Sequence, residues 1–183
     1  MSVHKAVTIA KRAASGFRRL ARDESAVTAI EMGLVAAPFF WLLCGILEVS
    51  AMCATTVLLD HGVMEATRRV RTLEFQKTGG DAAAFKKLVC DATFDMIDCT
   101  SNLSVDVKTF QNFTAANTST PKKADGSLDP AQLNFDPGAA GSIVVAKVYY
   151  QWKIVTPFFA TMWANGGSGT RLLESAAAFR NEP

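Results

Sequence analysis

The feature that most constrains this chain is a nearly uninterrupted apolar run from Met32 to Leu59. Its polar side chains are Glu48, Ser50, Thr55 and Thr56. As an α-helix the run would be roughly 42 Å long, more than the ~30 Å hydrocarbon core of a bilayer. The core helix of a soluble protein rarely needs apolar surface all round. We therefore expect a membrane-spanning helix over residues 27–59, with the lipid bilayer as its solvent.

The charges on either side of the run indicate its orientation. Basic residues precede it with no acidic residue before Asp23; they are Lys5, Lys11, Arg12, Arg18, Arg19 and Arg22. After the run, Asp60 and Glu65 come before the first arginines. The positive-inside rule predicts a cytoplasmic N-terminus and an extracytoplasmic domain over residues 60–183. A cleaved secretory signal is the competing interpretation, but its apolar region would be shorter and would not begin with acids.

Small residues recur along one narrow face of the expected helix. They are Gly33, Ala37, Cys44 and Ala51. Small side chains let helix backbones approach closely in lipid, although an alanine-rich span with no specific partner would look similar. Glu48 borders this face. A carboxylate facing lipid is costly, so we expect Glu48 to be protonated, hydrated or paired with a partner helix.

Both ends of the chain resemble a known family. A basic leader, the segment Arg22-Asp23-Glu24-Ser25, the segment Ala29-Ile30-Glu31 and then an apolar helix resemble a class III signal, the type cleaved by prepilin peptidases. Together with Gly45-Ile46-Leu47-Glu48-Val49 and the tail from Ala178 to Pro183, this arrangement is similar to the TadE-like pseudopilins of bacterial tight-adherence (Tad) pili.

The resemblance implies a processing site and an assembly site. Residues 1–26 would be a leader removed between Ala26 and Val27, where the family has glycine and this chain has Ala26. Glu31 would then be the fifth mature residue, the position of the pilin glutamate, and we expect assembly roles for Glu31 and Glu48. The implied partners are a prepilin peptidase, other pseudopilins or pilin subunits, and the inner-membrane assembly platform.

These features predict a minor pseudopilin that helps to assemble a Tad-type (type IVc) pilus. It would be a single-pass protein of the bacterial inner membrane, with a periplasmic C-terminal domain, and would act in the pilus or at its base. The alternative is a membrane anchor that carries an extracytoplasmic binding domain unrelated to pili. Glu31 separates the two, because a mere anchor has no use for a carboxylate at the cytoplasmic edge of its span.

The segment after the span alternates helix and turn signals. Residues 60–75 have one apolar face, formed by Val63, Ala66, Val70 and Leu73, which predicts an amphipathic stem that continues the membrane helix. Thr78-Gly79-Gly80 ends this helix, and Asp81 is a good cap for a second one that carries Phe85, Leu88 and Val89.

Cys90 and Cys99 follow closely, and in an oxidising compartment we expect a disulfide between them. A metal site would need more ligands nearby, and the sequence has no Cys-x-x-Cys pair or histidine cluster.

Three later segments have strand patterns. Leu103, Val105 and Val107 alternate with polar residues, residues 143–155 alternate over a longer stretch, and residues 170–180 form a third segment. One apolar sheet face needs a cover, and the stem helix supplies it. The expected fold class is therefore α+β and pilin-like, with a long N-terminal helix packed on a small antiparallel sheet.

Two segments between these strands have no assigned role. Residues 111–142 form a long polar stretch, and loops of this length are usually functional or disordered. Residues 157–163 are apolar but too short to cross a bilayer, so we expect them to pack beneath the sheet rather than to form an exposed docking patch.

Catalysis has no recognisable basis in the sequence. The two histidines, His4 and His61, stand apart, and no nucleophile elbow, phosphate-binding loop or zinc spacing occurs. We expect no enzymatic activity, no cofactor and no metal site. The formal net charge is only +2, with much of the positive charge in the leader, so nucleic acid is not an expected partner.

Overall fold

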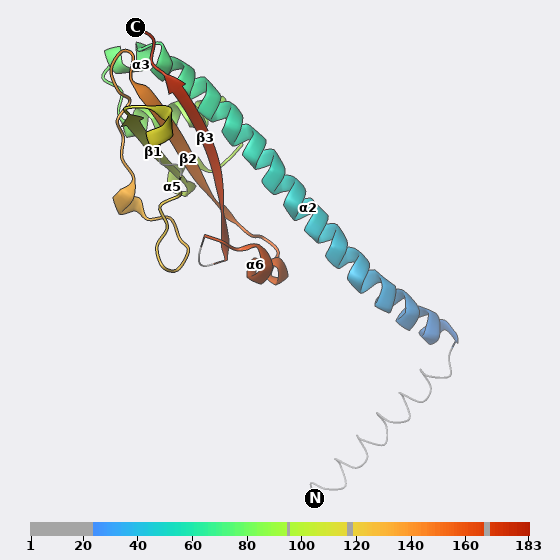
Figure 1. Ribbon diagram of the computed structural model, residues 1–183. Coiled ribbons are helices and arrows are strands. Elements are labelled where there is room, and N and C mark those ends of the chain that lie inside the picture. Colours follow the sequence, from blue (N-terminus) through green and yellow to red (C-terminus); the bar gives the residue numbers. More distant parts are fainter. Residues whose placement is uncertain (1–23, 95, 117–118, 167–168) are drawn as a thin grey trace, which may run out of the picture. The chain divides into compact units, whose positions relative to one another are not determined.

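The computed structural model describes residues 24–94, 96–116, 119–166 and 169–183 (Figure 1). Most of the predicted leader, residues 1–23, lies outside the described residues. The chain divides into two compact units, one up to Ile46 and the other from Leu47 to Pro183. The described residues form an α+β architecture, with one long helix, several short helices and a three-stranded antiparallel sheet.

The long helix α2 runs from Glu24 to Arg71. It contains a stretch that is long and apolar enough to span a membrane. In the first unit its large apolar side chains are exposed; Leu34, for example, is 72% exposed and Phe40 is 59% exposed. Because water is a poor solvent for such a surface, lipid or another apolar partner must cover it.

The helix ends at Arg71 rather than at Phe75, the end of the predicted stem. Leu73 has a left-handed backbone with φ of 61°, which breaks the helical hydrogen-bond pattern. The Gln76 side chain donates to the Val70 carbonyl at 3.0 Å and satisfies one of the free carbonyls at the helix end. A short helix, α3 (Glu74–Lys77), follows directly.

The helix predicted after Asp81 is confirmed as α4 (Ala82–Ala92). The Asp81 carboxylate accepts a hydrogen bond from the Ala84 amide at 2.8 Å, which caps the helix. Cys90 near the end of α4 forms a disulfide with Cys99, the first residue of α5 (Cys99–Asn102). Closing so short a loop stabilises the fold by roughly 2–3 kcal/mol on the chain-entropy estimate.

The three predicted strands are confirmed as β1 (Leu103–Phe110), β2 (Ile143–Lys153) and β3 (Thr170–Arg180). They pair antiparallel in the order β1-β2-β3. Val107, Ala146 and Ala177 lie side by side in this register and mark the inner face of the sheet. On the outer face Asp106 is opposite Lys147. The predicted alternation of apolar and polar residues therefore sets which face is buried.

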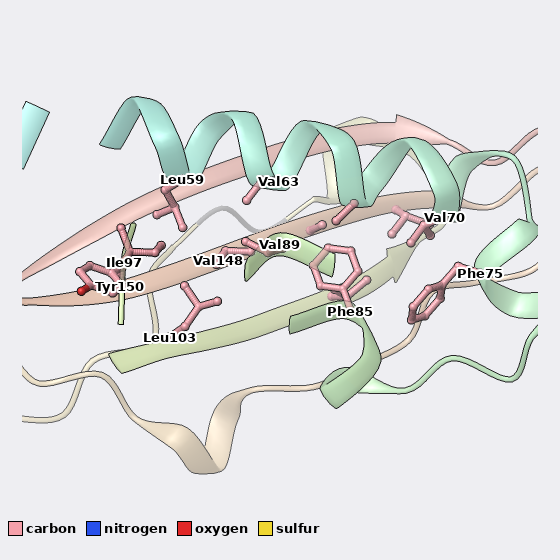
Figure 2. Close-up of a cluster of buried hydrophobic side chains, with 14 of the residues drawn as sticks. Leu59, Val63, Val70, Phe75, Phe85, Val89, Ile97, Leu103, Val148 and Tyr150 are labelled. Carbon is pink, nitrogen blue, oxygen red and sulfur yellow. The ribbon is translucent and has the colours of Figure 1, made fainter. Parts of the chain in front are cut away.

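The main core lies between the inner face of the sheet and the part of α2 that belongs to the second unit. Figure 2 shows Leu59, Val63 and Val70 of α2 pointing towards the strands. Val148 and Tyr150 of β2 meet them from the sheet. Each fully buried side chain of this size contributes about 1.5–3 kcal/mol. The prediction that the stem covers the sheet is therefore confirmed.

The long segment between β1 and β2 is ordered where the structure describes it, and includes the 3-10 turns η1 (Phe113–Ala115) and η2 (Pro130–Gln132). It runs along β1, where the Val107 amide donates to the Asn134 carbonyl and the Asp136 amide donates to the Val107 carbonyl, both at 2.8 Å. These bonds cover part of a sheet edge that would otherwise be free to pair with another chain.

Candidate functional site

The two carboxylates predicted to act in assembly lie in different environments along α2. Glu31 is exposed on the first unit. Glu48 belongs to the second unit and is only 6% exposed. Each residue therefore needs its own chemical explanation.

Glu48 is held by the residues at the end of β2. Its Oε1 accepts hydrogen bonds from the Trp152 indole Nε1 at 2.9 Å and from the Val155 amide at 3.2 Å. Its Oε2 accepts from the Thr156 amide and from the Thr156 hydroxyl, both at 3.0 Å. Four donors thus converge on one carboxylate, as the burial of such a group requires.

Pairing with a partner helix was one of three states expected for Glu48, besides protonation and hydration; the structure shows Glu48 paired within its own chain. The partners come from the same chain, and they clamp α2 to the segment that joins β2 to α6 (Pro157–Trp163). The sequence gives no direct sign of the clamp, because its members are more than one hundred residues from Glu48. The one local signal is the Thr156-Pro157 pair, which is typical of a helix start whose free amides need an acceptor.

The predicted small-residue face is open. Gly33, Ala37, Cys44 and Ala51 are all exposed, and nothing lies within 4 Å of the position that a Gly33 Cβ would occupy. A second helix could therefore approach the backbone of α2 closely along this line. Cys53 is exposed as well, so it does not contribute to the core.

The segment 157–163 was expected to pack beneath the sheet, and the structure buries only part of it. Phe159 is 3% exposed and stacks on Trp163, with ring centroids 4.3 Å apart. Phe158 and Met162 on the other side of α6 are 62% and 64% exposed, and neighbouring Val155 is 76% exposed. We call these three exposed residues, Val155, Phe158 and Met162, the apolar patch.

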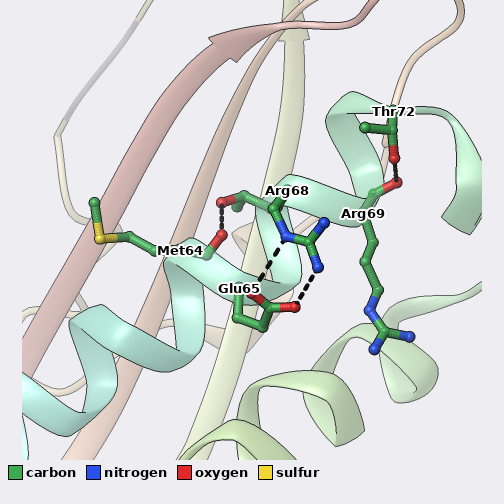
Figure 3. Close-up of polar contacts among 6 residues, drawn as sticks. Met64, Glu65, Arg68, Arg69 and Thr72 are labelled. Atoms are coloured by element: carbon green, nitrogen blue, oxygen red, sulfur yellow. Dashed lines mark hydrogen bonds and ion pairs between the residues drawn. The ribbon is translucent and has the colours of Figure 1, made fainter.

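The arginines of the stem lie on its outer side. Figure 3 shows Glu65 and Arg68 in a two-point ion pair. The Arg68 Nη2 donates to Glu65 Oε1 at 2.8 Å, and the Arg68 Nε donates to Oε2 at 3.3 Å. Both side chains are well exposed, so the pair contributes little stability. Arg71 instead holds the C-terminal tail: its carbonyl accepts from the Glu182 amide at 2.9 Å.

A polar cluster lies on the outer face of the sheet. The Lys147 ammonium group, nearly buried, is 3.0 Å from the Glu174 carboxylate. Tyr149 lies beside it, packed against Leu128 and Leu172. Burial, with the nearby charges of Glu174 and Asp106, holds the pKa of Tyr149 well above its ordinary value. Such a group stays neutral at physiological pH and is unsuited to proton transfer.

The described residues contain no group of three or more His, Cys, Asp or Glu side chains that could hold a metal ion. A hollow of about 530 Å³ lies where β1 leads into the long loop and β2 begins. Among the described residues in its wall only Arg180 is titratable, and its Nε donates to the Gly141 carbonyl at 2.9 Å. The hollow therefore lacks an acid–base pair of its own.

Comparison with known proteins gives no significant match to a protein-family model, a curated protein or a solved structure.

Proposed function

We propose that this protein is a non-enzymatic, TadE-like minor pseudopilin that is anchored in the bacterial inner membrane and helps to assemble a Tad-type pilus. The main support for the proposal is that the two parts of α2 have different surroundings. The helix is exposed and apolar in the first unit, and packs on a small antiparallel sheet in the second. A subunit built in this way can leave the bilayer for a filament while its domain stays folded.

The proposed orientation has the N-terminus in the cytoplasm and the domain in the periplasm. The basic residues of the leader support it through the positive-inside rule. The Cys90–Cys99 disulfide is also in keeping with an oxidising compartment.

Assembly would depend on the amino group made by processing between Ala26 and Val27. An α-amino group has an ordinary pKa of about 7.7–8.0 and is largely charged at neutral pH. Both that charge and the Glu31 carboxylate are costly to bring among lipid tails. Pairing the amine of one subunit with Glu31 of its neighbour offsets both costs and sets the axial register of the two helices.

The small-residue face gives such a neighbour room to pack. Gly33 and Ala37 lie close to Glu31 along α2, and both are exposed. Close approach at these positions would bring the two backbones together near the proposed ion pair.

The decisive experiment compares Glu31→Gln with Glu48→Gln in a piliated strain, together with mass spectrometry of the mature N-terminus. We expect Glu31→Gln to be inserted and cleaved after Ala26 but to lose piliation, because the amine has lost its charged partner. Glu48→Gln acts as the matched control for a change within the domain, and its main effect should be on subunit stability.

Retention of Met1 in the presence of a competent prepilin peptidase would contradict the proposal. It would favour the alternative, a permanently anchored extracytoplasmic binding domain. Normal piliation of the Glu31→Gln strain would separately exclude the pairing mechanism.

A further inference from the structure

We infer that the α6 end of the domain rests on the membrane in which the protein is anchored, with the apolar patch inserted into the lipid headgroup region. The partner is a phospholipid bilayer surface. The inference depends on the proposed membrane anchoring, and adds a second point of contact between the protein and its membrane.

The Glu48 clamp sets the position of the patch along α2. The amides of Val155 and Thr156 both donate to the Glu48 carboxylate, so the start of α6 is fixed beside this level of the helix. Phe158 and Met162 follow within the next two helical turns, in α6. The patch is therefore held next to the junction at Leu47, where the second unit begins.

The length of the exposed helix places that junction at the bilayer surface. From Val27 to Leu47 the helix is about 31 Å long, which matches the ~30 Å hydrocarbon core. Beyond Leu47 the buried face of α2 is covered by the protein itself: Met52 is 8% exposed and Leu59 is fully buried. On this inference the lipid-facing span ends near Leu47 and is shorter than the span predicted over residues 27–59.

The composition of the patch fits the region between headgroups and acyl chains. It has three large apolar side chains, and α6 has no charged residue. Exposed Lys153 ends β2 just before the patch, and Arg171, the second residue of β3, lies opposite Trp152. Apolar side chains flanked by cations suit a surface with apolar tails and anionic phosphates. Trp163, stacked on Phe159, belongs to the residue type enriched at this depth.

The alternative partner for the apolar patch is a second copy of the chain. The bilayer is favoured because the patch lies within a few residues of the span, where lipid is already present at high local concentration. Two protein copies would have to orient both patches towards each other while both helices stay in the membrane.

The test is the depth of nitroxide labels on the full chain in vesicles of phosphatidylethanolamine and phosphatidylglycerol. Single labelling sites are made in a Cys44→Ala, Cys53→Ala background that keeps the disulfide. Met162→Cys and Phe158→Cys report on the patch. Met96→Cys is the matched control, since Met96 is 70% exposed and Met162 is 64% exposed. Leu34→Cys reports on the span itself.

For each label we compare the collision rate with oxygen, which concentrates in lipid, to the collision rate with a water-soluble nickel chelate. We expect this ratio to be severalfold higher at both patch positions than at the Met96 label. Water-exposed labels at both patch positions, with a lipid-exposed label at Leu34, would overturn the inference and leave the anchor intact. A water-exposed label at Leu34 would overturn the anchor and the inference together. Spin–spin broadening at Met162 that disappears on dilution with unlabelled protein would assign the patch to a second copy and reject the bilayer.

Discussion

At the scale of single residues, Glu48 marks the point in the apolar run at which α2 is attached to the domain. The residue interrupts a segment that would otherwise suit lipid along its whole length. Its four hydrogen bonds convert a position that is costly in a membrane into an attachment point for the domain. A buried carboxylate is tolerated here because four hydrogen-bond donors point at its two oxygens.

Replacing Glu48 with glutamine tests this role. Glu48→Gln keeps the shape but turns one acceptor oxygen into an NH2 group, which leaves at least one of the Trp152 and Thr156 donors without a partner. We expect the free energy of unfolding in detergent micelles to fall by about 1–3 kcal/mol, measured by denaturant titration of tryptophan fluorescence. Glu31→Gln, at an exposed carboxylate of the same helix, should change it by less than about 0.5 kcal/mol. Equal effects of the two substitutions would contradict the clamp.

At the scale of elements, α2 and α4 meet closely at Gly62. A Cβ at this position would lie 2.8 Å from the Val89 carbonyl oxygen and 3.1 Å from the Thr93 methyl group. Glycine is otherwise unfavourable inside a helix, so its presence here is explained by packing. The disulfide at the end of α4 limits how far that helix could retreat.

The contact predicts that two Gly→Ala substitutions in α2 have different effects on the free energy of unfolding. Gly62→Ala should lower the midpoint of thermal unfolding and the free energy of unfolding, by about 1–3 kcal/mol, because backbone atoms of α4 must move. Gly33→Ala meets no atom within 4 Å and should cause no loss, since alanine is the better helix former. Circular dichroism of the two variants in the same detergent gives the comparison. A stable Gly62→Ala protein would show that α4 can shift without cost.

At the scale of the whole molecule, the free energy of unfolding should fall at alkaline pH because the tyrosines ionise. The sequence has two, Tyr149 and Tyr150, and both are buried. Burial raises the pKa of both phenols above the ordinary value near 10. The folded protein therefore keeps these protons to a higher pH than the unfolded chain does. Their contribution to stability is present below about pH 10 and is lost as the pH rises further.

We expect the folded protein to show little tyrosinate absorbance at pH 10, where the guanidinium-unfolded chain is about half ionised. The absorbance should then rise together with the loss of the circular dichroism signal. Tyr149→Phe should weaken the pH dependence at little cost, because the Tyr149 hydroxyl has no hydrogen-bond partner among the described residues. Half-ionised tyrosines at pH 10 in protein that is still folded would contradict this assignment.

The sequence by itself determined the local elements. Alternation at Leu103, Val105 and Val107 defined β1, and Asp81 defined the start of α4, because a strand pattern and a helix cap are read from neighbouring residues. The apolar run likewise defined a helix suited to a membrane. The pairing of Cys90 with Cys99 followed from their closeness in the chain.

Tertiary structure decided what covers each apolar surface. A helix buried by lipid and a helix buried by protein have the same apolar residues, so the run could not show that Glu48 and Leu59 face the domain instead of the bilayer. The partners of Glu48 lie at the far end of β2, and Phe135 of the long loop packs with Phe75 and Phe85. Such contacts join segments distant in the chain, and only the folded arrangement specifies them, because local periodicity does not encode which surfaces meet.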